Sequence, residues 1–375
     1  MTPIAPPAAI GVLGGGQLGR YAVVAARQMG YRTVVVDPDP SAPAGRLADE
    51  HVVAPYDDPV AVDRLSACAA VTTEFENPPA SVLETLATRT VVAPSAHAVA
   101  ICQDRIAEKR FLTEAGIRVG PHATLDVSGP LSGDDVRYPA ILKTARLGYD
   151  GKGQRTVVER TQLGEAHAHL GMAACVLEQQ LVLDAEVSVV LARSSTGETS
   201  VFDVAENHHV DGILDLTVVP ARVDAGIAEH AVGIARQIAA ALDYVGVLAV
   251  ELFVTGGDVL VNELAPRPHN SGHWTLDAAR TSQFDQQVRA MCGAGLGDPT
   301  RTAPAVAMVN LLGDLWAGSE PDWGAVLADA DARLHLYGKS AARPGRKMGH
   351  LTVLGDRPAD VAATALELRR AVTRG

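Results

Sequence analysis

Residues 250–274 read VELFVTGGDVLVNELAPRPHNSGHW, and the rest of the chain is organised around them. Two apolar runs, LAVELFV and DVLVNEL, flank TGGD at residues 255–258, a pattern that predicts a β-hairpin with a tight, glycine-requiring turn. Each run carries one acid that a strand does not need, Glu251 in the first and Glu263 in the second. Pairing of the two strands therefore brings side-chain oxygens together near the open end of the hairpin.

The register of this hairpin decides which oxygens face each other. Glu251 faces Glu263 if the connection has an odd number of residues and Asn262 if the number is even, because a one-residue slip exchanges the faces of a strand. Two carboxylates and an amide with no nearby cysteine suit Mg²⁺ better than zinc. The alternative is an exposed hairpin with solvated acids. Residues 265–273 favour a site, because they are too rich in proline for a helix and dense in hydrogen-bond donors.

The composition indicates a globular protein with a net negative charge. Of the 375 residues, 47% are hydrophobic and 20% are charged, enough for two or three domains. The formal charge of −12 opposes binding to nucleic acid or to an anionic membrane surface, so an anionic ligand must meet a local basic cluster. No run reaches the ~18 apolar residues of a spanning helix, and the N-terminal residues lack a basic export signal, so we expect no membrane insertion.

The cysteines indicate the compartment. Cys68, Cys102, Cys175 and Cys292 lie far apart in apolar segments, with no CxxC spacing. This pattern is typical of reduced core residues, which predicts a cytoplasmic protein.

The N-terminal residues have the pattern of a βαβ unit. Residues 8–13 are an apolar strand, Gly14, Gly16 and Gly19 satisfy GxGxxG at the start of a helix, and residues 34–37 end a second strand at Asp37. This pattern supports an NAD-dependent oxidoreductase as one hypothesis. The same glycines also allow close packing of a helix on a strand, and we find no later run that completes a six-stranded dinucleotide fold.

A further predicted strand, residues 70–76, ends in two acids. Because ligands meet the carboxyl ends of parallel strands, Glu74 and Glu76 are candidate site residues. The alternative is that they are surface acids that cap the next helix.

The middle of the chain carries a candidate phosphate site. Residues 103–116 predict a helix with Arg105 in its first turn, and residues 138–145 predict an apolar strand interrupted by Lys143. A buried lysine requires an anion such as a phosphate, although an edge-strand lysine is the alternative. The glycine-punctuated residues 146–154 lack the Walker A pattern and join two strands. They predict a flap that covers phosphates with backbone N–H groups and Lys152, rather than an ordinary surface turn.

Histidines and basic residues mark the remaining segments. Residues 206–212 predict a polar turn whose adjacent histidines point to opposite faces, so we expect no zinc site there.

Residues 275–292 predict one long helix. Later strands are expected at residues 306–312, 333–338 and up to residue 353, before a closing helix from Pro358. The cluster of four cations in residues 339–347 predicts a phosphate clamp, with a solvated loop as the alternative.

Together these motifs resemble one family, the N5-carboxyaminoimidazole ribonucleotide synthetases of the ATP-grasp superfamily. The resemblance covers nearly the whole chain and lies in the motifs GVLGGGQLGR, TTEFEN, ILKTARLGYDGKGQ, AENHHVDGIL, GVLAVELF, VNELAPRPHNSGHWT and LHLYGKSAARPGRKMGH. It implies an α/β and α+β chain with the ATP-grasp fold. The implied domains are a Rossmann-like preATP-grasp domain at residues 1–104, an ATP-grasp domain at 105–300 with a lid near 120–190, and a small C-terminal α/β domain at 301–375.

The resemblance also implies roles for particular residues. ATP is expected to bind Arg105, Lys143, Gly148, Tyr149, Asp150, Gly151, Lys152, Gly153, Gln154, Glu178, Gln179, Gln180, Leu181, Glu186, His209, Asn262 and Glu263. Mg²⁺ is expected to bind Glu251 and Glu263. The ribonucleotide is expected to bind Glu76, Tyr149, Asp150, Arg267, His269, Asn270, Ser271, Lys339 and Arg346. Catalytic roles are implied for Lys143, Lys152, Arg267 and Asp150.

The implied reaction is the ATP-dependent carboxylation of aminoimidazole ribonucleotide with bicarbonate, through carboxyphosphate, in purine biosynthesis. The residues fit this chemistry, because phosphoryl transfer needs metal and cations more than a covalent nucleophile.

The family also implies a homodimer and functional coupling to the downstream mutase. A sister ATP-grasp ligase, such as formate-dependent glycinamide ribonucleotide transformylase, remains an alternative. So does a non-catalytic nucleotide-sensing module, although such a module could lose Glu251 or Glu263, and both are present.

Overall fold

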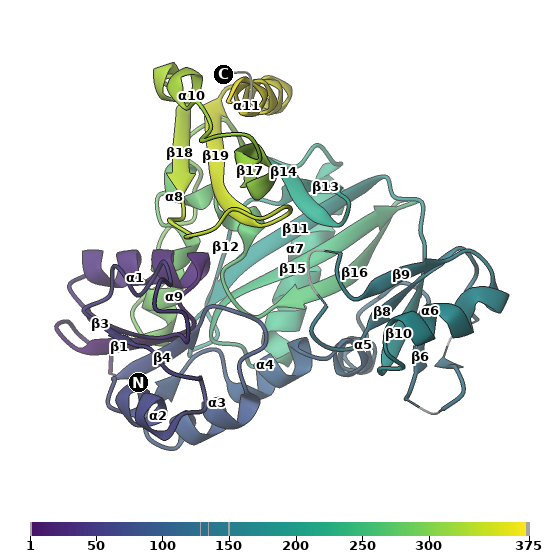
Figure 1. The fold of residues 1–375 in the computed structure, drawn as a ribbon, viewed down its shortest axis with the longest axis horizontal. Coiled ribbons are helices and arrows are strands. Elements are labelled where there is room, and N and C mark those ends of the chain that lie inside the picture. The colour runs from purple at the N-terminus through teal and green to yellow at the C-terminus, as the bar shows by residue number, and fades with distance from the viewer. Residues whose placement is uncertain (1, 128, 134, 149–150, 373–375) are drawn as a thin grey trace.

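The N-terminal part of the chain is a parallel sheet with helices packed on it (Figure 1). A computed structural model describes residues 2–127, 129–133, 135–148 and 151–372. The strands are β1 (Ala9–Leu13), β2 (Arg32–Val36), β3 (Glu50–Val52), β4 (Ala70–Thr73) and β5 (Val91–Val92), in the order β3-β2-β1-β4-β5. The helices are α1 (Gln17–Gln28), α2 (Pro59–Ser66), α3 (Ala80–Ala87) and α4 (Ala96–Cys102). The predicted βαβ unit is confirmed, in a sheet of five described strands.

Helix α5 (Arg105–Glu114) leads from this domain into a second sheet. Its N-cap is Asp104, whose side chain accepts the N–H groups of Ile106 and Ala107, and Gly116 follows its end with a φ of 70°. The second sheet is antiparallel, in the order β7-β6-β10-β8-β9. It contains β6 (His122–Leu125), β7 (Ser132–Gly133), β8 (Ala140–Thr144), β9 (Gln154–Val157) and β10 (Cys175–Gln179), with η1 (Arg160–Gln162) and α6 (Leu163–His169) beside it.

A third, nine-stranded sheet contains the predicted hairpin and extends into the C-terminal part of the chain. Its order is β16-β15-β11-β13-β14-β17-β19-β18, with β12 paired to β11. The strands are β11 (Ala185–Arg193), β12 (Thr199–Val201), β13 (Ala205–Val210), β14 (Ile213–Val219), β15 (Gly246–Thr255), β16 (Asp258–Ala265), β17 (Ala305–Leu312), β18 (Ala332–Leu336) and β19 (Lys347–Gly355). Helix α7 (Ala225–Ala241) packs its apolar face on β11, β15 and β16, and α11 (Pro358–Ala371) covers β17 and β19. Short helices complete the chain: η2 (Asn270–Gly272), α8 (Thr275–Ala278), α9 (Gln283–Met291), η3 (Gly313–Trp316) and α10 (Gly324–Ala328).

Three predicted elements differ from the structure. The single helix at 275–292 is wrong, because Ala279 is extended and bridges to Arg301, and a capping box between Ser282 and Asp285 starts the new helix α9. The polar turn at 206–212 is wrong for its first residues, since they belong to β13 and only the stretch after Val210 turns. The strand at 70–76 ends at Thr73. No helix of the described chain is long and apolar enough to cross a membrane.

Candidate active site

The hairpin β15–β16 places two carboxylates opposite each other. Glu251 pairs directly with Glu263, and a register shift follows between Glu251 and Leu252, so the first of the two predicted registers is the observed one. Burial raises the pKa of Glu251 to about 7, and the charge of Glu263 adds to this effect. Burial also opposes ionisation of Glu263, but the charge and hydrogen bond of Arg105, 2.7 Å away, hold the pKa of Glu263 below its ordinary value.

Cations from two elements face this hairpin. Glu178 at the end of β10 lies between Lys143 on β8, at 2.5 Å, and Lys109 on α5, at 3.1 Å. Burial raises the pKa of Glu178, but the charges of Lys109 and Lys143 outweigh it, and the net pKa lies well below the ordinary value. Lys109 also donates to the backbone carbonyl of Asn262 on the hairpin, at 2.8 Å. The half-buried Lys143 therefore has an anionic partner within the protein.

A cleft opens between α5, the N-terminal domain and the hairpin. It is lined by Glu76, Asn77, Cys102, Gln103, Arg105, Glu108, Ala145, Leu147, Gly148, Glu263 and Leu264. Four of these residues, Glu76, Arg105, Gly148 and Glu263, are predicted site residues, and they come from four separate parts of the sequence.

The segment after the hairpin carries four of the predicted ribonucleotide residues. Arg267 forms an ion pair with Glu76, and Nε2 of His269 lies 3.2 Å from Oε1 of Glu251. Burial, with the charges of Arg267 and Lys347, keeps the pKa of His269 well below its ordinary value. The side chains of Ser271 and Asn270 are buried, and Asn270 donates to Asn310 on β17 at 3.1 Å. Glu76, Arg267 and His269 thus lie on the same side of the site as the two hairpin acids.

The predicted flap joins β8 to β9, as the sequence indicated. Gly153 accepts a backbone hydrogen bond from Thr144 at 2.8 Å, and Gln154 pairs with Lys143 in the sheet. At Gly151, which has a φ of 75°, an added Cβ would lie 2.8 Å from the carbonyl oxygen of Asp211, so only glycine fits where the flap meets the β13–β14 turn. Lys152 is exposed. Tyr149 and Asp150 lie outside the described residues.

The remaining predicted ATP residues lie in two places. Gln179, Gln180 and Leu181 follow Glu178 at the end of β10, where the backbone N–H of Gln180 donates to Pro139. Glu186 on β11 lies 2.7 Å from Nδ1 of His209 on β13. Burial lowers the pKa of His209, but its hydrogen bond to Glu186 and the charge of Glu251 outweigh burial and raise it.

The basic loop at residues 339–347 lies against the N-terminal domain. Lys339 donates to Gln17 Oε1 and to the carbonyl of Lys347, both at 2.6 Å, and Arg346 donates to the carbonyl of Ala341. On the other side, Arg46 donates to the carbonyl of Gly338 at 3.2 Å. The loop therefore contacts the start of α1. The sequence pattern could not predict this contact, because the two segments lie more than 300 residues apart in the chain.

The glycine motif binds the protein's own carboxylates. Gly15 N–H donates to Asp37 at 2.7 Å, and the N–H groups of Gly16 and Gly19 donate to Glu74 at 3.0 Å. These donors are the ones that a dinucleotide pyrophosphate would need. Glu74 therefore caps the start of α1. The alternative prediction, that Glu74 caps the helix that follows it in the sequence, is wrong.

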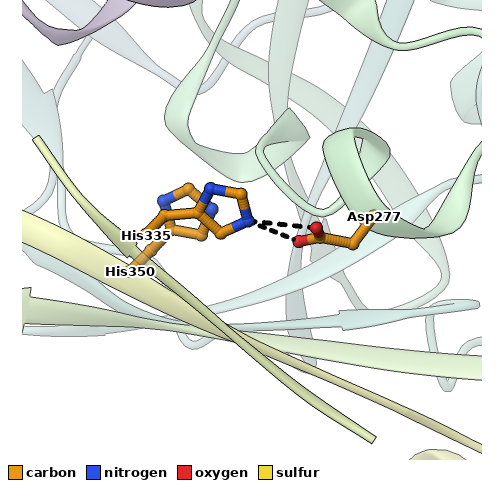
Figure 2. Close-up of side chains that lie close together, drawn as sticks. All are labelled: Asp277, His335 and His350. Atoms are coloured by element: carbon orange, nitrogen blue, oxygen red, sulfur yellow. Dashed lines mark hydrogen bonds and ion pairs between the residues drawn. The ribbon is translucent and has the colours of Figure 1, made fainter. Parts of the chain in front are cut away.

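Three histidines and an acid gather between the C-terminal strands and α8, and Asp277, His335 and His350 each place one potential ligand atom within 4.8 Å of the others. The rings of His335 and His350 lie face to face (Figure 2). Their centroids are 4.4 Å apart and their planes differ by 9°, and Nε2 of His335 lies 2.9 Å from Asp277. The ring of His273 stacks on the other side of His350, at 4.8 Å. Lone pairs of stacked imidazoles lie in parallel planes, so these nitrogens do not point at one metal position. The group is a packed junction between β18, β19 and α8.

Sequence reasoning missed Lys109, Glu108 and Gln17. Lys109 and Glu108 are adjacent and both buried, and the only signal was a pair of neighbouring charges within the helix that starts at Arg105. Gln17 lies within the glycine motif, where its side chain carried no signal for a lysine 322 residues away.

Family models match three consecutive parts of the chain. They describe a ribonucleotide synthetase preATP-grasp domain at residues 8–103, an ATP-grasp domain at 110–284 and a phosphoribosylaminoimidazole carboxylase C-terminal domain at 306–364. Each matched part lies inside one of the three predicted domains, whose boundaries stay a prediction.

Individual relatives are similar over nearly the whole length. The N5-carboxyaminoimidazole ribonucleotide synthase of Bacillus subtilis (strain 168) is 43% identical over 355 residues, 94% of this chain and 92% of that protein. The N5-carboxyaminoimidazole synthetase of Staphylococcus aureus complexed with ADP has a TM-score of 0.90 and 34% identity, and 98% of this chain and 99% of that chain are covered. The synthase of Aspergillus clavatus in complex with ADP and 5-aminoimidazole ribonucleotide has a TM-score of 0.86 and 29% identity, with 98% and 99% covered. Similarity of this extent shows that the chain belongs to the N5-carboxyaminoimidazole ribonucleotide synthase family of ATP-grasp enzymes.

Proposed function

We infer that the chain is an ATP-grasp ligase that carboxylates 5-aminoimidazole ribonucleotide with bicarbonate, forming N5-carboxyaminoimidazole ribonucleotide, ADP and phosphate in purine biosynthesis. One observation carries this inference beyond family membership. The cleft lined by Glu76, Arg105 and Glu263 is bordered by Glu251, which pairs with Glu263, and by Arg267, which pairs with Glu76. This grouping of acids and cations supports a site for a metal and for anionic ligands.

ATP is proposed to bind between the second and third sheets. Lys143 and Lys109 are positioned by Glu178 and offer positive charge to phosphates, and the flap at residues 148–154 would supply backbone donors and Lys152. Gln179, Gln180, Leu181, Glu186 and His209 complete the proposed nucleotide site. The ADP complex of the Staphylococcus aureus relative supports a nucleotide here by its overall similarity.

The residues of the hairpin fit Mg²⁺. Glu251 and Glu263 are paired across the hairpin, and the Oδ1 atom of Asn262 is buried with no hydrogen-bond partner among the described residues. An oxygen of this kind, beside two carboxylates whose charges repel, is the donor set that Mg²⁺ prefers. When bound, Mg²⁺ would neutralise charge on the phosphates of ATP. Without it, Arg105 holds Glu263 by an ion pair that a metal would have to share.

The proposed reaction has two steps. A bicarbonate oxygen attacks the γ-phosphorus of ATP and the bond to ADP breaks, which gives carboxyphosphate. The exocyclic amine of the ribonucleotide then attacks the carboxyl carbon, the bond to phosphate breaks, and the amine loses a proton. Lys143 and Lys152 would stabilise charge on the transferred phosphoryl group, and Arg267 would stabilise the carboxyl oxygens. Asp150, which lies outside the described residues, stays a predicted catalytic residue.

The ribonucleotide is proposed to lie between the N-terminal domain and the segment after the hairpin. Glu76, Arg267, His269, Asn270 and Ser271 would meet its ring and ribose, together with Tyr149 and Asp150. Lys339 and Arg346 would bind its 5′-phosphate, because the loop that carries them lies at the start of α1 in the N-terminal domain, whereas Lys143 is paired with Glu178 in the second sheet.

A substrate comparison tests this function. ADP release is measured with ATP, Mg²⁺ and bicarbonate, with and without aminoimidazole ribonucleotide, and in parallel with glycinamide ribonucleotide and formate. We expect ADP release that depends on aminoimidazole ribonucleotide. Turnover with glycinamide ribonucleotide and formate instead would identify the sister ligase, and turnover with neither pair would refute the proposal.

Three further expectations stay predictions. A homodimer and functional coupling to the mutase that consumes the product rest on family resemblance, and a cytoplasmic location rests on the cysteine pattern. Sedimentation of the purified chain would test the homodimer, and the rate of product formation by the mutase with and without this chain would test the coupling.

A further inference from the structure

A line of buried polar side chains crosses the third sheet and ends at His269. Thr217 on β14 lies 3.0 Å from Asn207 on β13, which lies 2.9 Å from Ser188 on β11. Ser188 lies 2.8 Å from Ser271, and the hydroxyl of Ser271 lies 2.9 Å from Nδ1 of His269. Thr217, Asn207, Ser188 and Ser271 are all buried. We call this line the hydroxyl relay.

The orientation of the Asn207 amide gives the relay one direction, because its nitrogen faces Ser188 and each hydroxyl then has a single hydrogen to pass on. Thr217 donates to Oδ1 of Asn207, and the amide nitrogen of Asn207 donates to Ser188. Ser188 then donates to Ser271. The remaining hydrogen of Ser271 points to Nδ1 of His269, which must accept it.

A second contact reaches the same conclusion independently. The backbone N–H of Ser271 lies 3.3 Å from Nδ1 of His269, as an N-cap contact of η2. An N–H group can only donate, so Nδ1 is an acceptor for both groups of Ser271. The hydrogen of the neutral ring is therefore on Nε2, the atom that lies 3.2 Å from Oε1 of Glu251.

The backbone of His269 is held as firmly as its ring. Its N–H donates to Oε1 of the buried Gln283 at 2.8 Å, and its carbonyl accepts from Nε2 of Gln283 at 2.8 Å. Glycine at position 272 allows these two hydrogen bonds, because a Cβ there would lie 2.5 Å from Oε1 of Gln283 and would displace its side chain. The position of the imidazole is thus fixed from the backbone, and its orientation is fixed from the relay.

We propose that Ser188 and Asn207 are positioning residues, which act through Ser271 to hold His269 as the Nε2–H tautomer directed at Glu251. His269 then offers the site a hydrogen-bond donor and no base. Partners of this kind behind a carboxylate that binds metal orient the carboxylate as well as the ring. The role in turnover rests on the proposed function, whereas the tautomer does not.

The competing explanation is that the relay only stabilises the sheet. Ser188 stands between Val187 and Val189 in a buried strand, where a small apolar residue would fill the same space without needing a partner. Ser200 on the neighbouring strand β12 provides the matched control. It is also a buried serine with two hydrogen bonds, to the carbonyl of Gly297 and to Gln286, but it has no contact with His269.

Nitrogen NMR of the protein labelled with ¹⁵N-histidine tests the tautomer directly, with His269 assigned by its loss in His269→Gln. We expect a protonated Nε2 and an unprotonated Nδ1 in the wild type and in Ser200→Ala. In Asn207→Asp the carboxylate can only accept, so Ser188 turns its hydrogen to it and no longer donates to Ser271. Ser271 can then donate to Ser188, which leaves its backbone N–H as the remaining donor to Nδ1, and a minor population with protonated Nδ1 should appear. A wild-type ring protonated at Nδ1 would overturn the proposal, and no change in Asn207→Asp would overturn the role of Ser188 and Asn207, because the backbone contact alone would then set the tautomer.

Kinetics test the consequence for turnover. Ser188→Ala and Asn207→Asp should lower kcat by about 10- to 100-fold while the KM for ATP stays within a few-fold, as for other residues that orient metal ligands. Ser188→Thr keeps the hydroxyl and should restore most of the activity, and Ser200→Ala should resemble the wild type. Equal effects of Ser188→Ala and Ser200→Ala would mean that the relay is only structural. If the wild type itself lacks turnover with aminoimidazole ribonucleotide, the proposed function fails, and the NMR result still decides the tautomer.

Discussion

Glu251 on β15 lies directly opposite Glu263 on β16, at the point where a bulge interrupts the hairpin. Burial, with the charge of the facing Glu263, raises the pKa of Glu251 to about 7. Arg105 relieves only one of the two carboxylates, since its guanidinium contacts Glu263. Two facing carboxylates with one cationic partner are costly for the empty hairpin, which supports the proposal that the pair binds a divalent cation.

Glu263→Gln should abolish Mg²⁺-dependent ADP release and leave the fold intact, because it removes one charge from the end of a hairpin and no apolar core group. ADP release at increasing Mg²⁺ and thermal melting measure the two effects. Asp258→Asn, at the turn of the same hairpin and paired with the exposed Arg118, is the matched control and should keep wild-type turnover. Normal turnover in Glu263→Gln would contradict the metal assignment.

Lys339→Ala and Arg346→Ala should each raise the KM for aminoimidazole ribonucleotide and leave that for ATP within a few-fold. A charge-assisted contact to phosphate contributes roughly 1.5 to 3 kcal/mol, or about ten- to a hundredfold in affinity. Steady-state kinetics with each substrate varied in turn make the measurement. Arg343→Ala, an exposed cation of the same loop, should have little effect. A change confined to the KM for ATP would mean that the loop binds ATP and not the ribonucleotide.

NADH should not bind, although the sequence contains GxGxxG. The N–H groups of Gly15, Gly16 and Gly19 already donate to Asp37 and Glu74, so a pyrophosphate would have to displace two carboxylates. A fluorescence titration of NADH with the protein measures this, with ATP binding to the same sample as the positive control. Saturation at micromolar NADH would revive the oxidoreductase hypothesis.

Glu108 should make the metal-free protein less stable as the pH rises. Burial raises the pKa of Glu108 from 4.5 to about 8, against the opposing charges of Lys109 and Arg105. The folded state therefore keeps a proton that the unfolded state has lost, so stability falls between pH 4.5 and about 8 and then levels off. Glu108→Gln lacks this proton equilibrium.

Denaturant unfolding at pH 6 and pH 8 compares the two proteins. The wild type should lose roughly 2 kcal/mol of unfolding free energy relative to Glu108→Gln over this interval. An equal response of both proteins to pH would show that Glu108 is already ionised in the folded state.

The sequence predicted elements whose signal is local. The turn at residues 255–258 fixed the hairpin, and the apolar strand around Lys143 together with the following glycines located the flap. The helix predicted at 275–292 failed for a local reason too, because apolar periodicity continues across Ala279 while the capping box of Ser282 restarts the helix.

Long-range contacts could not be read from the sequence in the same way. Glu178 forms an ion pair with Lys109 on α5, and Gln17 accepts a hydrogen bond from Lys339 near the other end of the chain. Ser188 looked like an ordinary strand residue, because its role depends on Asn207 and Ser271, which only the packing of the sheet brings near. Periodicity indicates which face of a strand is buried, but it does not identify the residues of other elements that pack against that face.

Labelled bicarbonate tests the central claim most directly. The protein is supplied with ATP, Mg²⁺, aminoimidazole ribonucleotide and bicarbonate that carries ¹³C and ¹⁸O, and the products are examined at once by NMR and mass spectrometry. Attack of bicarbonate on ATP followed by carboxyl transfer predicts ¹³C on the ribonucleotide and one ¹⁸O in the released phosphate. Phosphate without ¹⁸O together with a ribonucleotide free of ¹³C would contradict the proposed carboxylation.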